Sequence, residues 1–336
     1  MLILNQLIWF RQDLRCHDHV ALWHAIQAGE CYALVILSPQ QWQLHHDAPI
    51  KIDFYLKQLH DLQTQLAKLN IPLIVQTIDT WQNIPAYLKQ LSQKLQIETL
   101  HANMEFGLHE QQRDAQVQNT IFPTQAIYYQ DRTLFPVASI RNKTHQPYQV
   151  FGAFKKVTYA RLSLSLPHCY PLPEPQSAHI LNTLPTANIP CMQDFNLATE
   201  IQTIWPIGEL IAQQRLDEFI ADRLEYYHHE RNLPQVNGTS QLSAYLNIGI
   251  LSARQCLNAL FREQNGYFHL TGLGQQTWLD ELLWREFYQH ILFDFPRVSK
   301  HLPFKMQTQN IAWRDAPEDL QAWQQGQTGI PIVDAG

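Results

Sequence analysis

The stretch from residue 278 to 288 (WLDELLWREFY) carries the side chains whose types and spacing are best suited to chemistry. A helix here would place Glu281, Trp284, Arg285 and Tyr288 on one face, at about 100° per residue. Leucines and a phenylalanine fill the opposite face, so we expect the helix to be buried on both sides. A buried carboxylate must be hydrogen-bonded, paired or functional, because an isolated charge inside a protein is costly. An ion pair between Glu281 and Arg285, four residues apart, would satisfy that need without any chemistry.

A second candidate is the segment from residue 237 to 243 (NGTSQLS). Its Asn-Gly pair indicates a turn, and Thr239, Ser240 and Ser243 then open a helix. Hydroxyls and free backbone N–H groups at a helix start suit a phosphate or a diphosphate. Ordinary N-capping by serine or threonine explains the same pattern.

Other reactive residues form no recognisable site. The sixteen histidines show no HxxxH or HExxH spacing, and the five cysteines show no CxxC spacing. We therefore expect no metal site and a reducing, cytoplasmic location. The sequence also lacks a GxSxG motif, a P-loop and a Cys/His nucleophile pattern.

The elements that position these residues fall into two classes. Short apolar runs predict buried parallel strands at residues 2–10, 32–38, 72–77, 98–103 and 126–130. Helices are predicted between them, most clearly at 51–69 and at 19–28, the latter with Asp18 as N-cap and Gly29 as C-terminal stop. This alternation predicts a doubly wound, Rossmann-like α/β domain over residues 1–130. The first strand-to-helix turn, 11–15, has no glycine-rich dinucleotide fingerprint.

Beyond residue 130 the sequence predicts a linker and helices instead of alternating strands and helices. Six prolines between residues 161 and 196 predict an extended linker, placed at 131–199, and an all-helical domain follows at 200–336. The length allows about two domains.

The net charge of −6 is not that of a typical nucleic-acid binder, so any DNA contact must use a local patch. The apolar start lacks a basic region before it and predicts a core strand, not a signal peptide or membrane span.

Four separated motifs in register resemble the DNA photolyase/cryptochrome family, and most closely the bacterial class I cyclobutane pyrimidine dimer photolyases. They lie at 9–15 (WFRQDLR), 237–243, 278–288 and 300–304 (KHLPF), with a fifth match at 329–336 (GIPIVDAG). The resemblance implies an α/β antenna domain followed by an all-helical FAD-binding domain. The family's last motif continues beyond Gly336, so we expect a C-terminally truncated FAD domain that exposes apolar surface, aggregates or holds flavin weakly.

The resemblance also implies ligand-binding residues. Matches to positions that line the flavin and its diphosphate are Tyr227, Thr239, Ser240, Leu242, Ser243 and Arg285. Three further residues, His45, Glu110 and Lys300, match positions that hold a methenyltetrahydrofolate antenna.

The implied activity is light-driven repair of cyclobutane pyrimidine dimers by electron transfer from reduced FAD to a flipped-out dimer. Photolyases are among the base-flipping enzymes. Trp284 would pack against the dimer, and Glu281 would hydrogen-bond its edge. Trp313 matches the outer member of the tryptophan relay that photoreduces the flavin, with its inner partners expected beyond Gly336.

Two other interpretations share this fold. One is a cryptochrome photoreceptor without repair activity, although Glu281 favours repair because 6-4 photolyases and animal cryptochromes carry glutamine there. The other is an inactive truncated fragment. The expected partner is damaged DNA, single- or double-stranded, and we expect a monomer without membrane contact.

Overall fold

The computed structural model describes residues 4–198, 204–300 and 302–335. The chain divides into two compact units, Met1–Pro296 and Arg297–Gly336.

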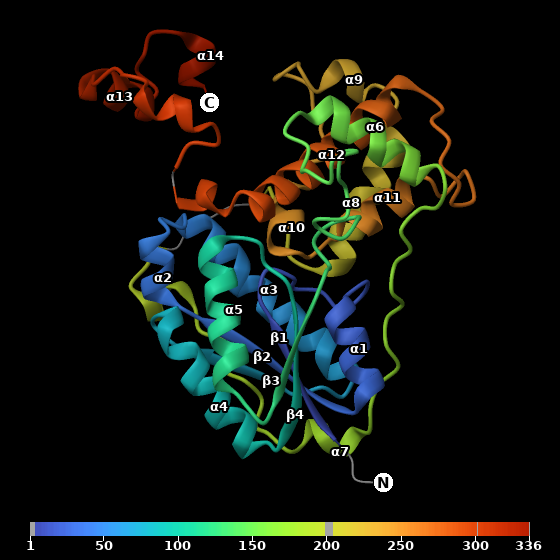
Figure 1. Cartoon of the computed structure of the whole chain (residues 1–336), viewed down its shortest axis with the longest axis vertical. Helices are drawn as coiled ribbons and strands as arrows, with labels where there is room; N and C mark the ends of the chain where they lie inside the picture. The colour runs from blue at the N-terminus through green and yellow to red at the C-terminus, as the bar shows by residue number, and fades with distance from the viewer. Residues whose placement is uncertain (1–3, 199–203, 301, 336) are drawn as a thin grey trace. The chain divides into compact units, whose positions relative to one another are not determined.

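A five-stranded parallel sheet forms the centre of the first half of the larger unit (Figure 1). Its spatial order is β3-β2-β1-β4-β5, which reverses direction at β1 and confirms the predicted doubly wound architecture. The strands are β1 (Asn5–Phe10), β2 (Glu30–Leu37), β3 (Leu73–Thr77), β4 (Ile97–Asn103) and β5 (Gln125–Tyr129).

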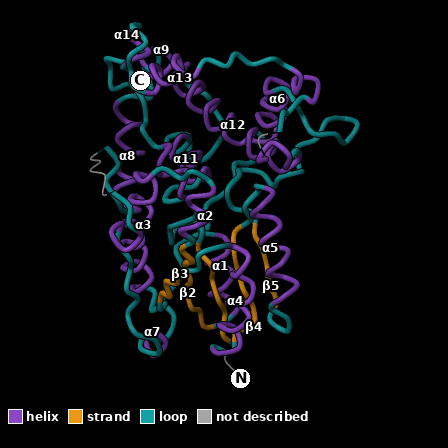
Figure 2. The backbone as a smooth tube through the Cα atoms, turned by 90° about the vertical axis from the view of Figure 1, so that its left-hand side faces the viewer, coloured by secondary structure: helices purple, strands orange, loops and turns teal. Residues whose placement is uncertain are grey.

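Helices cover both faces of this sheet (Figure 2). One apolar cluster joins the sheet to α1 (Val20–Ala28) and α3 (Pro49–Lys68), and a second joins it to α4 (Ile84–Lys94) and α5 (Leu108–Thr120). A short helix, α2 (Pro39–Leu44), follows β2. The apolar residues of α3 recur at helical spacing and are buried, so burial of one face accounts for this helix.

The start of α1 differs from the prediction. His19, not Asp18, is the N-cap, and its Nδ1 accepts a hydrogen bond from the backbone N–H of Leu22 at 3.0 Å. Asp18 has a positive φ of 54°. Its carboxylate accepts hydrogen bonds from Ser252 and Arg254, residues that are distant in sequence. The prediction failed because Asp18 forms hydrogen bonds with residues distant in sequence, and these contacts replace a local capping bond.

The segment predicted as a linker contains regular structure. It includes α6 (Phe151–Leu162), α7 (Ala178–Leu181) and a 3-10 turn at Met192–Phe195. Between α6 and α7 the chain forms no helix or strand and runs along the α/β part (Figure 1). α6 instead packs against the helical part, through aromatic contacts of Phe151 and Phe154.

Among the described residues of the rest of the larger unit, the regular structure is helical. The helices are α8 (Glu209–Asp222), α9 (Tyr227–Glu230), α10 (Ser243–Ile248), α11 (Ala253–Leu260) and α12 (Leu273–Asp294). Within the described ranges no strand follows β5, as predicted. Gly249 ends α10 with φ of 73°, and a Cβ there would lie 2.3 Å from the carbonyl oxygen of Gln12. Only glycine allows the turn after β1 to approach this closely.

Four buried charges join the α/β part to the helices, and we call them the four-charge cluster: Arg15, Asp18, Asp131 and Arg254. Arg15 lies 2.7 Å from Asp131, while Arg254 lies 3.0 Å from Asp18 and 2.7 Å from Asp131. Burial alone would raise the pKa of Asp131, but the charges of Arg15 and Arg254 hold it well below its ordinary value. Each cation therefore has a carboxylate partner.

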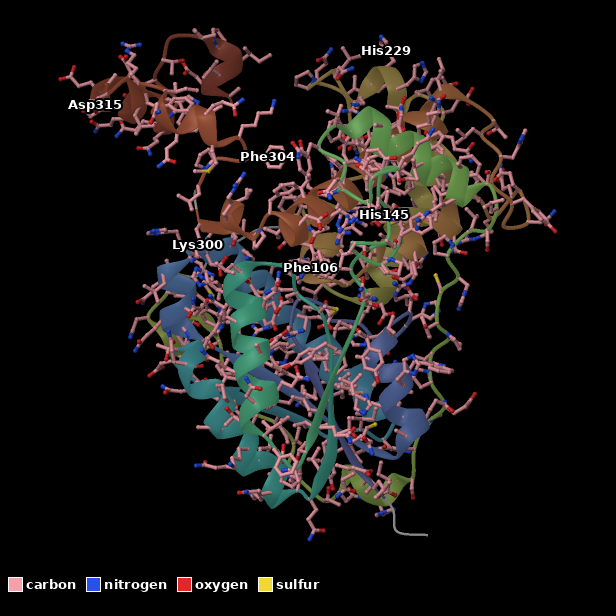
Figure 3. The ribbon with its side chains drawn as sticks, in the orientation of Figure 1. Phe106, His145, His229, Lys300, Phe304 and Asp315 are labelled. Atoms are coloured by element: carbon pink, nitrogen blue, oxygen red, sulfur yellow. The ribbon has the colours of Figure 1, made fainter. Side chains whose placement is uncertain are left out.

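An aromatic contact adds to this junction. Phe106 (labelled in Figure 3), in the loop after β4, meets Phe293 of α12 edge to face, with ring centroids 6.0 Å apart.

A 3-10 turn, Pro296–Lys300, begins at the last residue of the larger unit and continues into the smaller one. The described part of the smaller unit then holds a 3-10 turn at Met306–Asn310, α13 (Pro317–Gln324) and α14 (Pro331–Asp334). Asp334 accepts hydrogen bonds from Thr328 and from the backbone of Gly329, which closes the last loop. Among the helices of the described residues, none has the length and apolar character needed to span a bilayer.

Candidate functional site

A cavity of ≈ 400 Å³ opens beside α10 and α12 in the larger unit. Its walls combine hydroxyls, amides, apolar groups and three charged side chains. The lining residues are Arg132, Tyr227, Ser240, Leu242, Ser243, Leu246, Asn247, Trp278, Glu281, Leu282, Arg285 and Gln289.

Helix α12 supplies one wall because its lining residues recur at helical spacing. Trp278, Glu281, Leu282, Arg285 and Gln289 fall on one face of the helix. An adjacent face of the helix is anchored by Glu286. Its carboxylate accepts the backbone N–H groups of residues 134 and 135 at 2.8 and 3.0 Å.

Arg285 is the central cation of the cavity. It donates to the backbone carbonyls of Arg132 at 2.8 Å and Leu246 at 3.4 Å. The alternative i,i+4 pair with Glu281 is therefore wrong, since the guanidinium turns toward backbone oxygens. Desolvation, followed by the neighbouring charge of Arg132, lowers the pKa of Arg285 to about 10. An anion in the cavity would lower the free-energy cost of keeping the guanidinium of Arg285 charged there.

Glu281 differs from the expected buried carboxylate. Its side chain is 38% exposed, and it accepts a hydrogen bond from Arg231 at 2.5 Å. Arg231 follows α9 and also lies over the ring of Tyr227, 5.4 Å from its centroid. The carboxylate is thus held at the rim of the cavity by a partner from another helix. The expectation of a helix buried on both sides is also wrong, because Tyr288 is 59% exposed.

The hydroxyls before α10 are not used for capping. Leu242 occupies the N-cap of α10, and no side chain caps this helix. Ser240 and Ser243 instead line the cavity. Thr239 lies in the preceding loop, where its carbonyl accepts from Arg223 at 3.2 Å, and it is not among the lining residues.

Trp284 has a different neighbourhood from Glu281 and Arg285. It stacks on Phe151 of α6, with centroids 3.7 Å apart and planes at 15°, and on Tyr288 at 5.6 Å. It is not among the residues that line the cavity. The structure therefore brings Glu281 and Arg285, but not Trp284, to this one cavity.

Three polar lining residues were missed from the sequence: Arg132, Asn247 and Gln289. Gln289 could have been found, because it lies four residues after Arg285 on the same helical face. Arg132 lies in the segment after β5, where no periodicity fixes which way a side chain points.

The residues matched to an antenna lie in both units. His45 ends α2, lies 2.8 Å from Gln41 and meets Trp81 edge to face, with centroids 5.3 Å apart. Glu110 lies in the first turn of α5, one residue after His109, whose ring is 6.1 Å from that of His45. Lys300 (labelled in Figure 3) belongs to the smaller unit, as does Trp313, whose side chain is 84% exposed.

The cavity fits the diphosphate of the flavin that the resemblance implies. Arg285 makes no hydrogen bond to a carboxylate among the described residues, and two serines stand nearby. Guanidinium and hydroxyl groups are suitable donors to phosphate oxygens. Arg285, Ser240 and Ser243 would hold the diphosphate, with Tyr227 and Leu242 beside them.

Comparisons with known proteins identify relatives of this chain. Residues 6–176 match the family model of DNA photolyase, and residues 278–336 match that of the FAD binding domain of DNA photolyase. The deoxyribodipyrimidine photo-lyase of Escherichia coli is 36% identical over 98% of this chain and 69% of its own length. The same enzyme of Vibrio cholerae is 36% identical over 98% of this chain and 70% of its own length.

Solved structures show the same fold. A bacterial class III photolyase from Agrobacterium tumefaciens aligns with a TM-score of 0.80 and 24% identity, covering 100% of this chain and 68% of its own. A Synechocystis cryptochrome aligns with a TM-score of 0.81 and 22% identity, covering 100% of this chain and 71% of its own. From its sheet order, its cavity and these relatives, the chain belongs to the DNA photolyase family.

Proposed function

We propose that this protein repairs cyclobutane pyrimidine dimers in DNA in a light-dependent reaction, with FAD held in the cavity beside α10 and α12. The observation that carries the proposal is the cavity itself. It combines the guanidinium of Arg285, which makes no hydrogen bond to a carboxylate among the described residues, with Ser240 and Ser243, at positions that match the family's flavin site. Bound reduced FAD would supply the electron that splits the dimer.

The proposed substrate residues are Glu281 and Trp284. Glu281 stands at the cavity rim, where a flipped pyrimidine could replace Arg231 as its hydrogen-bond partner. Trp284 offers an indole that Phe151 holds in place by stacking. Such an indole can pack against an extruded base.

A folate antenna is the proposed second cofactor. His45 and Glu110 follow β2 and β4 and lie near Trp81 and His109. This is the carboxyl edge of the parallel sheet, where open α/β sheets bind ligands. We propose that His45, Glu110 and Lys300 hold methenyltetrahydrofolate.

We also propose the domain bounds and two further cofactor-site residues. Residues 1–130 would form the antenna domain, 131–199 the connection and 200–336 the FAD-binding domain. Thr239 would contact the flavin, and Trp313 would be the outer electron donor. The five free cysteines support a reducing, cytoplasmic location, and the protein would act as a monomer.

The test is repair of an oligonucleotide with one thymine dimer, by protein loaded with reduced FAD. Trp284→Ala should weaken binding of the damaged oligonucleotide by about 1–3 kcal/mol, the range for base–aromatic stacking. Glu281→Ala should lower the repair yield per absorbed photon with a smaller effect on binding. Flavin content should stay unchanged in both.

The matched control is Trp23→Ala, because Trp23 is also a partly buried helical indole beside an aromatic ring, that of Tyr170. It should leave binding and repair unchanged. A parent protein that binds FAD but repairs no dimers would overturn the proposal and favour a cryptochrome-type photoreceptor.

A further inference from the structure

Arg132 lies at the point where the α/β part meets the cavity. It comes three residues after the end of β5 and directly after Asp131 of the four-charge cluster. Its side chain is 18% exposed and lines the cavity. Its backbone carbonyl accepts from Arg285, which brings the two arginines together.

The acidic partner of Arg132 is shared. Arg132 lies 3.7 Å from Glu105, too far for a hydrogen bond. Glu105 lies closer to Arg113, at 2.9 Å, and to Arg11, at 3.5 Å.

Charge around this carboxylate is therefore unbalanced. Arg11 and Arg113 also share Asp114, each at 2.7 Å. Three guanidiniums thus face two carboxylates, and the one with the longest ion pair is Arg132, which faces the cavity.

Arg285 adds a second cation, which makes no hydrogen bond to a carboxylate in the part of the chain that the structure describes. The adjacent acid on α12, Glu286, accepts two backbone N–H groups and lies 3.2 Å from His290. Two partly desolvated cations therefore line one cavity. Leaving such charges unpaired is costly, so the arrangement favours a ligand with two negative charges.

We propose that Arg132 is a second phosphate-holding residue, which acts with Arg285 on the diphosphate of the dinucleotide. This inference rests on the proposed function, since it assumes that FAD occupies this cavity. A diphosphate carries two negative charges and matches two guanidiniums, whereas riboflavin carries none. Arg132 is thus a specificity residue that favours the dinucleotide over a flavin without phosphate.

The long ion pair suits this role. A guanidinium 3.7 Å from a shared carboxylate can turn toward a phosphate without leaving Glu105 unpaired, because Arg11 and Arg113 remain. For the same reason, Arg132→Met should fold.

The experiment is a titration of flavin-free, full-chain protein with FAD and, separately, with riboflavin, in the dark. Arg132→Met should weaken FAD binding on the order of tenfold, the loss of one charged hydrogen-bonding group. Riboflavin binding should not change, and Arg132→Lys should recover much of the FAD affinity. The FAD affinity of Arg132→Met should also depend less on salt.

The matched control is Arg141→Met. Arg141 is also partly buried, but it pairs through two hydrogen bonds with Asp294 and does not line the cavity. It should bind FAD as the parent does. Arg285→Met serves as the reference for the cavity.

The outcomes separate the two proposals. If Arg285→Met weakens FAD binding but Arg132→Met does not, the inference is wrong and the proposed function stands. If neither change affects FAD binding, FAD does not occupy this cavity and the proposed function fails. Equal losses for FAD and riboflavin, or a lysine variant as weak as the methionine variant, would also overturn the role of Arg132.

Discussion

Two groups of arginines in the larger unit have opposite charge balance. In the four-charge cluster, Arg15 and Arg254 face Asp18 and Asp131, and all four side chains are almost fully buried. In the cavity, Arg285 donates to backbone carbonyls and to no carboxylate within the described ranges, and Arg132 shares one distant carboxylate with two other arginines. Both groups lie near the same segment, since Asp131 and Arg132 are neighbours.

The difference separates cations that already have carboxylate partners from cations that could pair with a bound anion. A buried ion that already has its partner contributes to the fold, and removing one member leaves the other unpaired. A cation without such a partner adds desolvation cost to the fold and gains from binding an anion. Replacing an arginine should therefore lower the free energy of unfolding in the four-charge cluster but not in the cavity, where it should weaken anion binding instead.

The largest effect is expected in the four-charge cluster. Arg254→Met leaves Asp18 without its ion-pair partner and Asp131 with only Arg15. We expect a loss of about 3–5 kcal/mol in the free energy of unfolding, the range for breaking a buried pair. Urea unfolding of flavin-free protein measures this. A loss below about 1 kcal/mol would show that the cluster is not structural.

Removal of the cavity cation should affect binding instead of folding. Arg285→Met should weaken FAD binding by about 2 kcal/mol. The free energy of unfolding without flavin should stay the same or rise, because a desolvated cation is removed. Titration and urea unfolding of one preparation give both values. A large stability loss with unchanged FAD binding would reverse the comparison.

Acid should act on the four-charge cluster through Asp131. Its pKa is lower in the folded protein than in the unfolded chain, so its contribution to stability is complete above the unfolded value of about 4. That contribution is lost as the pH falls toward the folded value. Unfolding free energies measured from pH 6 to pH 3 should decrease, and Asp131→Asn should flatten part of that slope. An unchanged slope would assign the acid sensitivity to other carboxylates.

The smallest effect is expected at the rim of the cavity. Arg231 and Glu281 form a half-exposed pair, and such pairs contribute about 1 kcal/mol or less. Arg231→Met should therefore change stability no more than Arg262→Met, which breaks the exposed pair with Asp217. Urea unfolding of the two variants compares them directly. A markedly larger loss for Arg231→Met would make this pair structural, and Glu281 would not be free to take another partner.

Much of the fold was predictable because burial determines it. All five strands were found within a few residues of their bounds, since a strand with both faces covered reads as a continuous apolar run. Helix α3 was found from its repeated apolar face. The N-cap of α1 was missed because the partners of Asp18, Ser252 and Arg254, lie more than two hundred residues away. Helix α6 was missed among residues treated as linker.

The site was predictable only in part, for a related reason. Helical spacing correctly predicted that Glu281 and Arg285 line one cavity. It could not show that Glu281 pairs with Arg231, which follows another helix. It also could not show that Trp284 stacks on Phe151 of α6. Arg132 gave no signal, because the orientation of a side chain outside regular structure depends on its surroundings.

The close approach of Gly249 to the turn after β1 has a consequence for tolerated sequence variation. A Cβ at this position would also lie 2.5 Å from the Cα of Asp13, so only a backbone shift could make room. Gly266 has a similar φ of 76° but open space around it, so asparagine there meets only the modest cost of a left-handed conformation. In a saturation library, position 249 should thus admit glycine almost alone, and position 266 should admit asparagine as well. Because the turn at residues 11–15 and the end of α10 are in such close contact, we expect substitutions in the two segments to occur together in related sequences.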